Sequence, residues 1–184
     1  MDGKRIVQDG YNAIADNYLA TRTRDSEDVR LLEDLVHRLP RGARVLDAGC
    51  GAGIPITQRL SQSIGVDFSE TQLRLAHRLV PRAQFICQDM TSPAFPDDFF
   101  DAICSYYAII HIPRDEHRPL LLDFHRMLKP SGLAFLCLGA GELEEDIEED
   151  YLGAPMYWSH YDGEIYIPNA GIVWIRYCLG QARG

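Results

Sequence analysis

Short apolar runs alternate along the chain with segments whose apolar residues recur at helical spacing. Runs of this kind are typical of buried strands, and the longer periodic segments between them are typical of amphipathic helices. The predicted strands are "ARVLDAG" (43–49), "SIGVD" (63–67), "AQFICQD" (83–89), "FDAICSYY" (100–107) and "GLAFLCLGA" (132–140).

Helical segments occupy the intervals before and between these strands. Residues 25–40 form one apolar stripe that opens at Ser26 and closes at Pro40, and Pro55 fits the first turn of a helix through Ile56 and Leu60. Another helix is stopped by "KPSG" at 129–132. The two stripes consist of Val29, Leu32, Leu35, Val36 and Leu39, and of Leu120, Leu121, Phe124, Met127 and Leu128.

A further helix is predicted to begin directly behind Asp67. Ser69 and Gln72 have the spacing of a capping box, in which each side chain bonds the other residue's backbone N–H. Phe68 and Leu73 have the spacing of the hydrophobic staple that accompanies such a box. The acid at the end of the second strand therefore stands at the start of a helix.

Strands that alternate with helices predict an α/β fold. We expect a Rossmann-like, doubly wound and mostly parallel sheet with helices on both faces, in a single domain spanning residues 1–184. Ligands of such sheets bind outside the carboxyl ends of the strands. Asp47, Asp67 and Asp89 fall at three successive strand ends. One aspartate there is usually a cap or a turn former, but three in register favour one shared ligand.

The glycine-rich loop after the first strand narrows the choice of ligand. Its glycines are Gly49, Gly51 and Gly53, and Ile54 stands where a dinucleotide fingerprint needs a small residue. A pyrophosphate would also be repelled by Asp47, so a nicotinamide-dependent oxidoreductase is the disfavoured alternative. A ligand with an ammonium group, a ribose diol and an exocyclic amine would offer a donor to each carboxylate.

Composition and charge weigh against several classes of function. The net charge is −9, and no basic cluster is present that would follow a phosphate backbone, so a nucleic-acid partner is not expected. The five cysteines are scattered without a CxxC pair, which predicts no metal site and no disulfide framework. With no apolar run that suggests a signal peptide or a membrane span, the expected location is the cytoplasm.

Five segments together resemble the class I S-adenosylmethionine-dependent methyltransferases, in order and at the usual separations. They are "VLDAGCGAG", "GVDFSE", "CQDM", "FDAICSYYAIIHI" and "RMLKPSGLAFL". The resemblance is to the small-molecule members of that family. It implies S-adenosylmethionine as the cofactor and methyl transfer, by in-line displacement, to an oxygen, nitrogen or sulfur atom of a small-molecule acceptor.

The same resemblance implies roles for individual residues. Asp47 would face the methionine amino end, Asp67 the ribose hydroxyls and Asp89 the adenine amine. Residues 1–40 would form a helical lid in which Tyr18 closes over the cofactor, although a plain amphipathic helix is an equal alternative for "YNAIADNYLA". The remaining implied cofactor contacts, within a core of residues 41–138, are Gly49, Cys50, Gly51, Gly53, Phe68, Met90 and Tyr106.

Residues after the fourth strand border the methyl group in this family. Here they include Tyr106, Tyr107 and His111. We predict that Tyr107 contacts the acceptor and takes part in catalysis, and that His111 binds the acceptor and serves as its general base, because imidazole titrates near neutral pH. The alternative is that His111 caps the next helix or bonds the backbone.

The segment 139–184 is expected to hold an acidic stretch, an aromatic substrate loop and an edge strand. The acidic run "GELEEDIEEDY" is most simply a solvated helix or loop. The loop "GAPMYWSHYDG" is predicted to bind substrate through Tyr157, Trp158 and His160, with His160 and His111 as a catalytic pair, or else to pack as core.

The last predicted strand, "GIVWIRYCL", leaves the family's usual final strand without a counterpart. An open sheet edge bearing Ile172, Trp174 and Ile175 would favour pairing with a second chain, so we predict a homodimer or a malleable edge. This departure also keeps a second function open. A protein that binds S-adenosylmethionine without turnover, as a regulatory or partner subunit, would need the same cofactor motifs.

Overall fold

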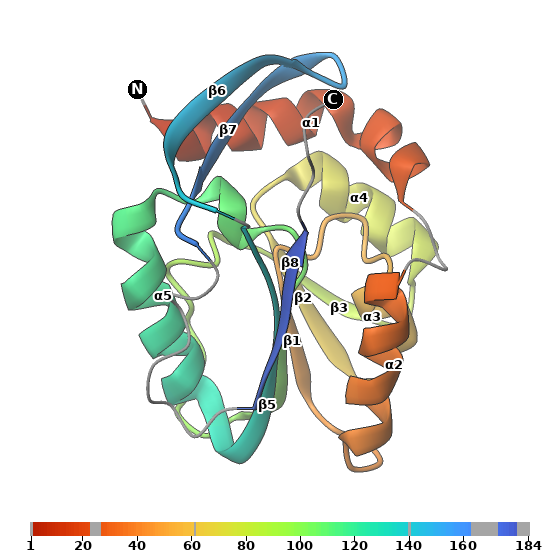
Figure 1. Cartoon of the computed structure of the whole chain (residues 1–184). Coiled ribbons are helices and arrows are strands. Elements are labelled where there is room, and N and C mark those ends of the chain that lie inside the picture. The colour runs from red at the N-terminus through yellow and green to blue at the C-terminus, as the bar shows by residue number, and fades with distance from the viewer. Residues whose placement is uncertain (1, 23–26, 61, 140, 163–172, 180–184) are drawn as a thin grey trace.

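A six-stranded sheet in the order β3-β2-β1-β4-β5-β8 forms the centre of the molecule (Figure 1). The computed structural model describes residues 2–22, 27–60, 62–139, 141–162 and 173–179. All pairings in the six-stranded sheet are parallel. Its strands are β1 (Val45–Ala48), β2 (Ser63–Asp67), β3 (Gln84–Cys87), β4 (Phe100–Ser105), β5 (Leu128–Gly139) and β8 (Val173–Leu179).

Helices cover both faces of this sheet, which confirms the predicted fold class. Figure 1 shows α2 (Glu27–Arg38), α3 (Ile56–Arg59) and α4 (Glu70–Leu79) on one side and α5 (Arg114–Met127) on the other. Strand alternation divides the core between them: Val45 joins the buried cluster on the α2 side and Leu46 the cluster on the α5 side. Both of these side chains are almost fully buried.

The predicted turn between the last helix and its strand is wrong in detail. Helix α5 ends at Met127 and β5 starts at Leu128, so "KPSG" lies inside the strand. The strand absorbs these residues through an irregularity, because Phe100 pairs with Leu128 whereas Ala102 pairs with Leu133. The proline therefore ends the helix but does not open a loop.

The acidic and aromatic segments form a second, two-stranded antiparallel sheet, β6 (Leu143–Tyr151) and β7 (Ala154–His160). The expectation of a solvated acidic helix or loop and of an aromatic loop is therefore wrong. This hairpin lies over helix α1 (Gly3–Thr21), and Figure 1 shows both at the top of the molecule. Aromatic and aliphatic side chains of the two elements form one buried cluster.

Two glycines let α1 lie close against β7. A Cβ atom added at Gly3 would lie 2.9 Å from the ring of Tyr157, and one at Gly10 would lie 2.7 Å from the backbone oxygen of Pro155. A larger residue at Gly10 would meet backbone that cannot rotate away. The seven-residue spacing of these glycines places both on the same face of the helix.

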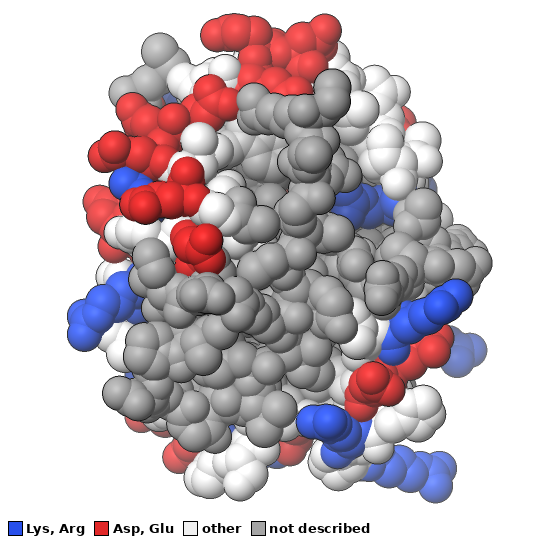
Figure 2. Space-filling view, in the orientation of Figure 1, with Lys and Arg blue, Asp and Glu red and all other residues white. Residues whose placement is uncertain are grey.

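The outer surface of β6 is strongly acidic. Figure 2 shows Asp and Glu side chains gathered over the hairpin, at the top and upper left of the view. Like charges on an edge strand oppose its pairing with another strand, so this edge resists association. The exposed acidic residues of β6 are Glu144, Glu145, Glu149 and Asp150.

The C-terminal strand lies at the edge of the main sheet. Its backbone pairs with β5 in parallel, with Trp174 opposite Ala134 and Ile175 opposite Phe135. Ile172 and Ser26 lie outside the described residues, as do the side chains of Trp174 and Ile175. The predicted homodimer through this edge stays a prediction.

Candidate functional site

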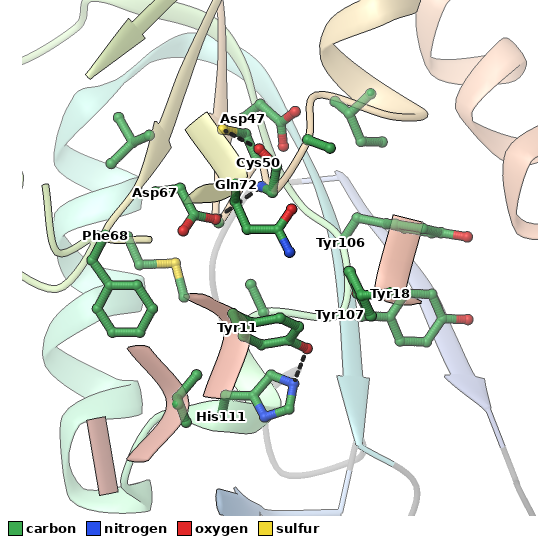
Figure 3. Close-up of a pocket in the computed structure, with 18 of the residues that line it drawn as sticks. Tyr11, Tyr18, Asp47, Cys50, Asp67, Phe68, Gln72, Tyr106, Tyr107 and His111 are labelled. Carbon is green, nitrogen blue, oxygen red and sulfur yellow. Dashed lines mark hydrogen bonds between the residues drawn. The ribbon is translucent and has the colours of Figure 1, made fainter. Parts of the chain in front are cut away.

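A cavity lies at the carboxyl ends of β1, β2 and β4, beneath α1. Its wall combines α1, the glycine loop, the residues behind β2 and β3, and the segment around the short helix η1 (Ile109–His111) (Figure 3). No described residue of α2 takes part, so only the first half of the predicted lid covers it. The sequence-predicted residues that line it are Tyr18, Asp47, Gly49, Cys50, Gly51, Asp67, Phe68, Asp89, Met90, Tyr106, Tyr107 and His111.

Glycine is required where the loop meets the end of β4. Gly49 has a φ of 76°, and a Cβ atom there would lie 2.2 Å from the Cβ atom of Ala108. Gly53 serves packing instead, because it is not among the lining residues and faces Val80 and Phe85. The loop can thus pass tightly between the strand ends, where Gly49 N and Cys50 N donate to Val66 O.

Asp67 is held by the backbone on both sides of its carboxylate. Gly51 N donates to Oδ2 and Ser69 N donates to Oδ1, each at 2.8 Å. Burial outweighs these bonds and raises the pKa of Asp67 to about 6. The carboxylate is therefore fixed in place but carries a negative charge with little compensation.

Asp47 is more deeply buried, with 2% of its surface exposed. The backbone N–H and the hydroxyl of Thr57 donate to its Oδ2 atom, at 3.1 and 2.6 Å, so it also holds the start of α3. Burial raises the pKa of Asp47 to about 7, and Asp67 adds to the rise. Two undercompensated carboxylates in one cavity favour a ligand that carries positive charge.

Asp89 differs because it has a cationic partner. Lys4 of α1 donates to Oδ2 at 3.0 Å, and Thr91 N donates to Oδ1 at 2.9 Å. Burial raises the pKa of Asp89, but the bonds from Thr91 and Lys4 outweigh it and leave the pKa below its ordinary value. Lys4 also pairs with Glu116 of α5, so the three side chains tie α1 to the rim of the cavity.

His111 is the centre of a directed chain of hydrogen bonds. Its Nδ1 atom lies 2.8 Å from the carbonyl oxygen of Tyr157, which can only accept, so Nδ1 carries the proton. Burial lowers the pKa of His111 to about 4, so the ring is neutral and Nε2 is an acceptor. The hydroxyl of Tyr11 donates to Nε2 over 2.8 Å. His111 thus bonds the backbone, which was the alternative to a role as general base, but its ring also lines the cavity.

A cation lies among the tyrosines at the other end of the cavity. The guanidinium carbon of Arg22 is 4.2 Å from the ring centre of Tyr18 and 5.5 Å from that of Tyr107. Its Nε atom is buried and has no hydrogen-bond partner among the described residues. Tyr107 holds a φ of 58°, a left-handed conformation that is costly for a bulky residue and recurs at functional sites.

The predicted substrate residues of β7 lie behind the cavity wall. Tyr157, Trp158 and His160 are described but are not among the lining residues. The ring of Trp158 packs 4.4 Å from that of His111, and the Nδ1 atom of His160 donates to the carbonyl of Gly141 at 3.0 Å. They form a strand that supports His111, and the structure does not place His160 in the cavity beside it.

Further residues of the cavity were not singled out in the sequence. Tyr11 stands seven residues before Tyr18 on the same face of α1, a spacing that could have identified it. The spacing of Gln72 predicts a helix cap, and Arg22 belongs to no motif. Among the described residues, no group of three or more His, Cys, Asp and Glu side chains is placed to hold a metal ion. In the same part of the chain, no helix is both long and apolar enough to cross a membrane.

Comparison with known proteins agrees with this geometry. A family model described as "Methyltransferase domain" matches residues 45–132, from β1 into β5. A TehB-like SAM-dependent methyltransferase structure from Corynebacterium glutamicum is similar over 66% of this chain and 71% of that one, with 30% identity and a TM-score of 0.56. The chain belongs to the class I S-adenosylmethionine-dependent methyltransferases.

Two curated relatives show how far the similarity extends. A demethylmenaquinone methyltransferase of Lysinibacillus sphaericus is 28% identical over 112 residues, which cover 56% of this chain and 47% of the relative. A trans-aconitate 2-methyltransferase of Variovorax paradoxus is 32% identical over 120 residues, which cover 61% of this chain and 45% of the relative. The methyltransferase chain thus spans about half the length of these relatives.

Proposed function

We propose that this methyltransferase transfers the methyl group of S-adenosylmethionine to an oxygen, nitrogen or sulfur atom of a small-molecule acceptor. The observation that carries the proposal is the cavity itself, in which Asp47 and Asp67 stand at adjacent strand ends beside the glycine loop. The names of the curated relatives, which specify small molecules, support this class of acceptor.

The described residues fit the cofactor. Asp47 would bind its ammonium group and Asp67 its ribose hydroxyls, while Phe68 and Met90 would pack on the adenine. Burial raises the pKa of both carboxylates, so a cationic ligand that restores their charge is favoured. When bound, the cofactor supplies a methyl group on a positively charged sulfur, an excellent leaving group, so the protein has mainly to position the acceptor.

Tyr11 and His111 would together remove the proton of the acceptor. The hydroxyl hydrogen of Tyr11 is directed to Nε2 of His111, and Tyr18 is a second hydrogen-bond partner of the same hydroxyl. Tyr11 Oη therefore accepts from Tyr18 and has one lone pair left for a group in the cavity. An acceptor hydroxyl or amine would donate to Tyr11 Oη. As its proton moves to that atom, the tyrosine's own proton passes to Nε2 of His111. His111 would then take the proton through Tyr11, without touching the acceptor. Because burial lowers the pKa of His111 to about 4, this proton transfer would accompany or follow methyl transfer, which makes the acceptor's proton acidic.

Calorimetric titration with S-adenosylhomocysteine tests the cofactor site. We expect binding by the intact protein, loss of binding in Asp67→Ala, and unchanged binding in Asp16→Ala, which removes an exposed carboxylate on α1. NADH serves as the competing ligand. Binding of NADH in place of the sulfur nucleoside would refute the proposal.

Turnover is tested with methyl-labelled S-adenosylmethionine and a panel of phenols, carboxylic acids, amines and thiols. Labelled product from any of them, reduced in Tyr11→Phe, would support catalysis. Cofactor binding with no product across the panel would favour the alternative of a regulatory protein without turnover.

A further inference from the structure

Gln72 is a buried amide without partners. Its residue is 1% exposed, and neither Nε2 nor Oε1 has a hydrogen-bond partner among the described residues. A buried amide that bonds nothing is unfavourable, and such groups in native proteins call for an explanation. Three of the five side-chain atoms in this condition belong to residues that line the cavity: Nε2 and Oε1 of Gln72 and Nε of Arg22.

The helix cap explains why the amide is unpartnered. Half of the predicted capping box is present, because Gln72 N donates to Ser69 Oγ at 3.2 Å. In the other half, the glutamine side chain would reach back to Ser69 N, but that N–H donates to Asp67. The hydroxyl of Ser69 also bonds Oδ1 of Asn12, at 2.8 Å. The two groups that a cap would offer to the amide are thus engaged elsewhere.

The amide is directed into the cavity. Gln72 is one of the lining residues, and a Cβ atom added at Gly51 would lie 3.7 Å from its Oε1 atom. Figure 3 shows the amide between Asp67 and Tyr106, on the side of Asp67 that faces away from Phe68. The amide therefore lies beside the glycine loop, at the residue whose N–H group donates to Asp67.

We propose that Gln72 binds the amino-acid end of the cofactor. Nε2 would donate to its carboxylate and Oε1 would accept from its ammonium group, since one amide offers both a donor and an acceptor. The carboxylates of Asp47 and Asp67 can meet only the cationic and hydroxyl groups of the ligand. The neutral amide of Gln72 can donate a hydrogen bond to the carboxylate of the ligand without neutralising the charge of either aspartate. This inference rests on the proposed function.

The test compares two ligands on one variant. Gln72→Met keeps the length of the side chain and removes both polar atoms. Gln58→Met makes the same change at an exposed position in α3 and serves as the matched control. S-adenosylhomocysteine carries the amino-acid end, whereas 5′-methylthioadenosine has the same nucleoside without it. Both ligands are titrated by calorimetry, and thermal unfolding is followed without ligand.

We expect Gln72→Met to weaken S-adenosylhomocysteine binding by about 10- to 100-fold, which is the range for a hydrogen bond to a charged group. Methylthioadenosine affinity should change by less than about twofold. The ligand-free variant should unfold at a higher temperature than the parent protein, because two unpaired polar atoms have left the interior. A residue with a purely structural role would show the opposite change in unfolding temperature.

Other outcomes overturn the inference. Unchanged affinity for S-adenosylhomocysteine would show that the amide does not touch the ligand. Equal losses for both ligands would place the contact on the nucleoside and refute the assignment to the amino-acid end. If the parent protein binds neither ligand, the proposed function fails and the role of Gln72 fails with it. If the parent binds both and only the selective loss is missing, the role of Gln72 alone is refuted.

Discussion

The affinity of the cavity for the amino-acid end of the cofactor should rise with pH, because Asp47 ionises late. Burial raises the pKa of Asp47 to about 7, so at pH 5 only about one molecule in a hundred has this carboxylate charged. A bound ammonium group favours the charged form of Asp47 and lowers its pKa, so binding releases the proton of this carboxyl group. We expect the ionisation of Asp47 by itself to increase affinity for S-adenosylhomocysteine about 100-fold from pH 5 to pH 8, or about 2.7 kcal/mol.

The control for this experiment is methylthioadenosine. Burial raises the pKa of Asp67 to about 6, so it titrates in the same range, and a ligand with the ribose but no ammonium group reports its contribution alone. We would titrate both ligands between pH 5 and pH 8 and repeat the calorimetry in two buffers of different ionisation enthalpy to count released protons. Parallel pH profiles for the two ligands would refute the reasoning.

The same carboxylate predicts a change in stability with the opposite dependence on pH. A pKa raised from 3.8 to about 7 means that the folded protein holds this proton more tightly than the unfolded chain does. The stabilisation that comes from this tighter proton binding is complete below pH 4 and is lost as the pH rises through 7. Asp47→Asn should therefore be more stable than the parent at pH 8, by up to about 4 kcal/mol, and similar at pH 4. Urea unfolding at both values measures this difference, and an equal one at both would contradict it.

Three further substitutions test other parts of the structure. Tyr11→Phe leaves Nε2 of His111 without its donor, so the free energy of unfolding should fall by about 1–3 kcal/mol in urea denaturation; no loss would argue against this bond. Leu32→Ala leaves a cavity at a fully buried position of α2 and should lower the free energy of unfolding by about 2–5 kcal/mol in the same assay. A loss below about 1 kcal/mol would mean that neighbouring side chains fill the space, against the close packing described for this helix. Lys4→Met removes the partly exposed ion pairs with Asp89 and Glu116, so the free energy of unfolding should fall by only about 1 kcal/mol, and by less in high salt.

The parallel sheet could be predicted because its strands are local features of the sequence. Each is a short apolar run, and in β1 and β2 the aspartate at or next to the carboxyl end lines the cavity. The sequence predicts that Asp47 and Asp67 share one site, because the geometry of a parallel sheet brings successive strand ends together. Both line the cavity, as the spacing indicated.

The hairpin could not be predicted from its own residues. The apolar positions Leu143, Ile147 and Tyr151 recur every four residues, a spacing that fits one turn of a helix as well as two pleats of a strand. What decides between them is the contact with α1, where Ile147 and Tyr151 join a cluster with residues near the other end of the sequence. A pattern read within one segment contains no information about such a partner.

The polar contacts of the cavity were hidden for a similar reason. Tyr11 and His111 are 100 positions apart, and only the folded chain gives His111 a neutral ring with both nitrogens engaged. The spacing of Ser69 and Gln72 fits a capping box. In the folded chain the N–H group of Ser69 donates to Asp67 and not to Gln72, and the spacing alone does not show which of the two side chains accepts this bond.

The close fit of α1 against β7 has a consequence for how the protein assembles on the ribosome. Gly3 and Gly10 lie against a strand that follows them by about 150 residues. At 5–20 residues per second, roughly 8–30 s separate the synthesis of the helix from that of its partner. During that time α1 can already contact α4, but the apolar face that packs on β7 stays uncovered. A nascent chain that already contains the strand-end aspartates and α1 would still lack the strand that packs on the outer face of α1, so the covered cavity reaches its final support only once β7 has been made.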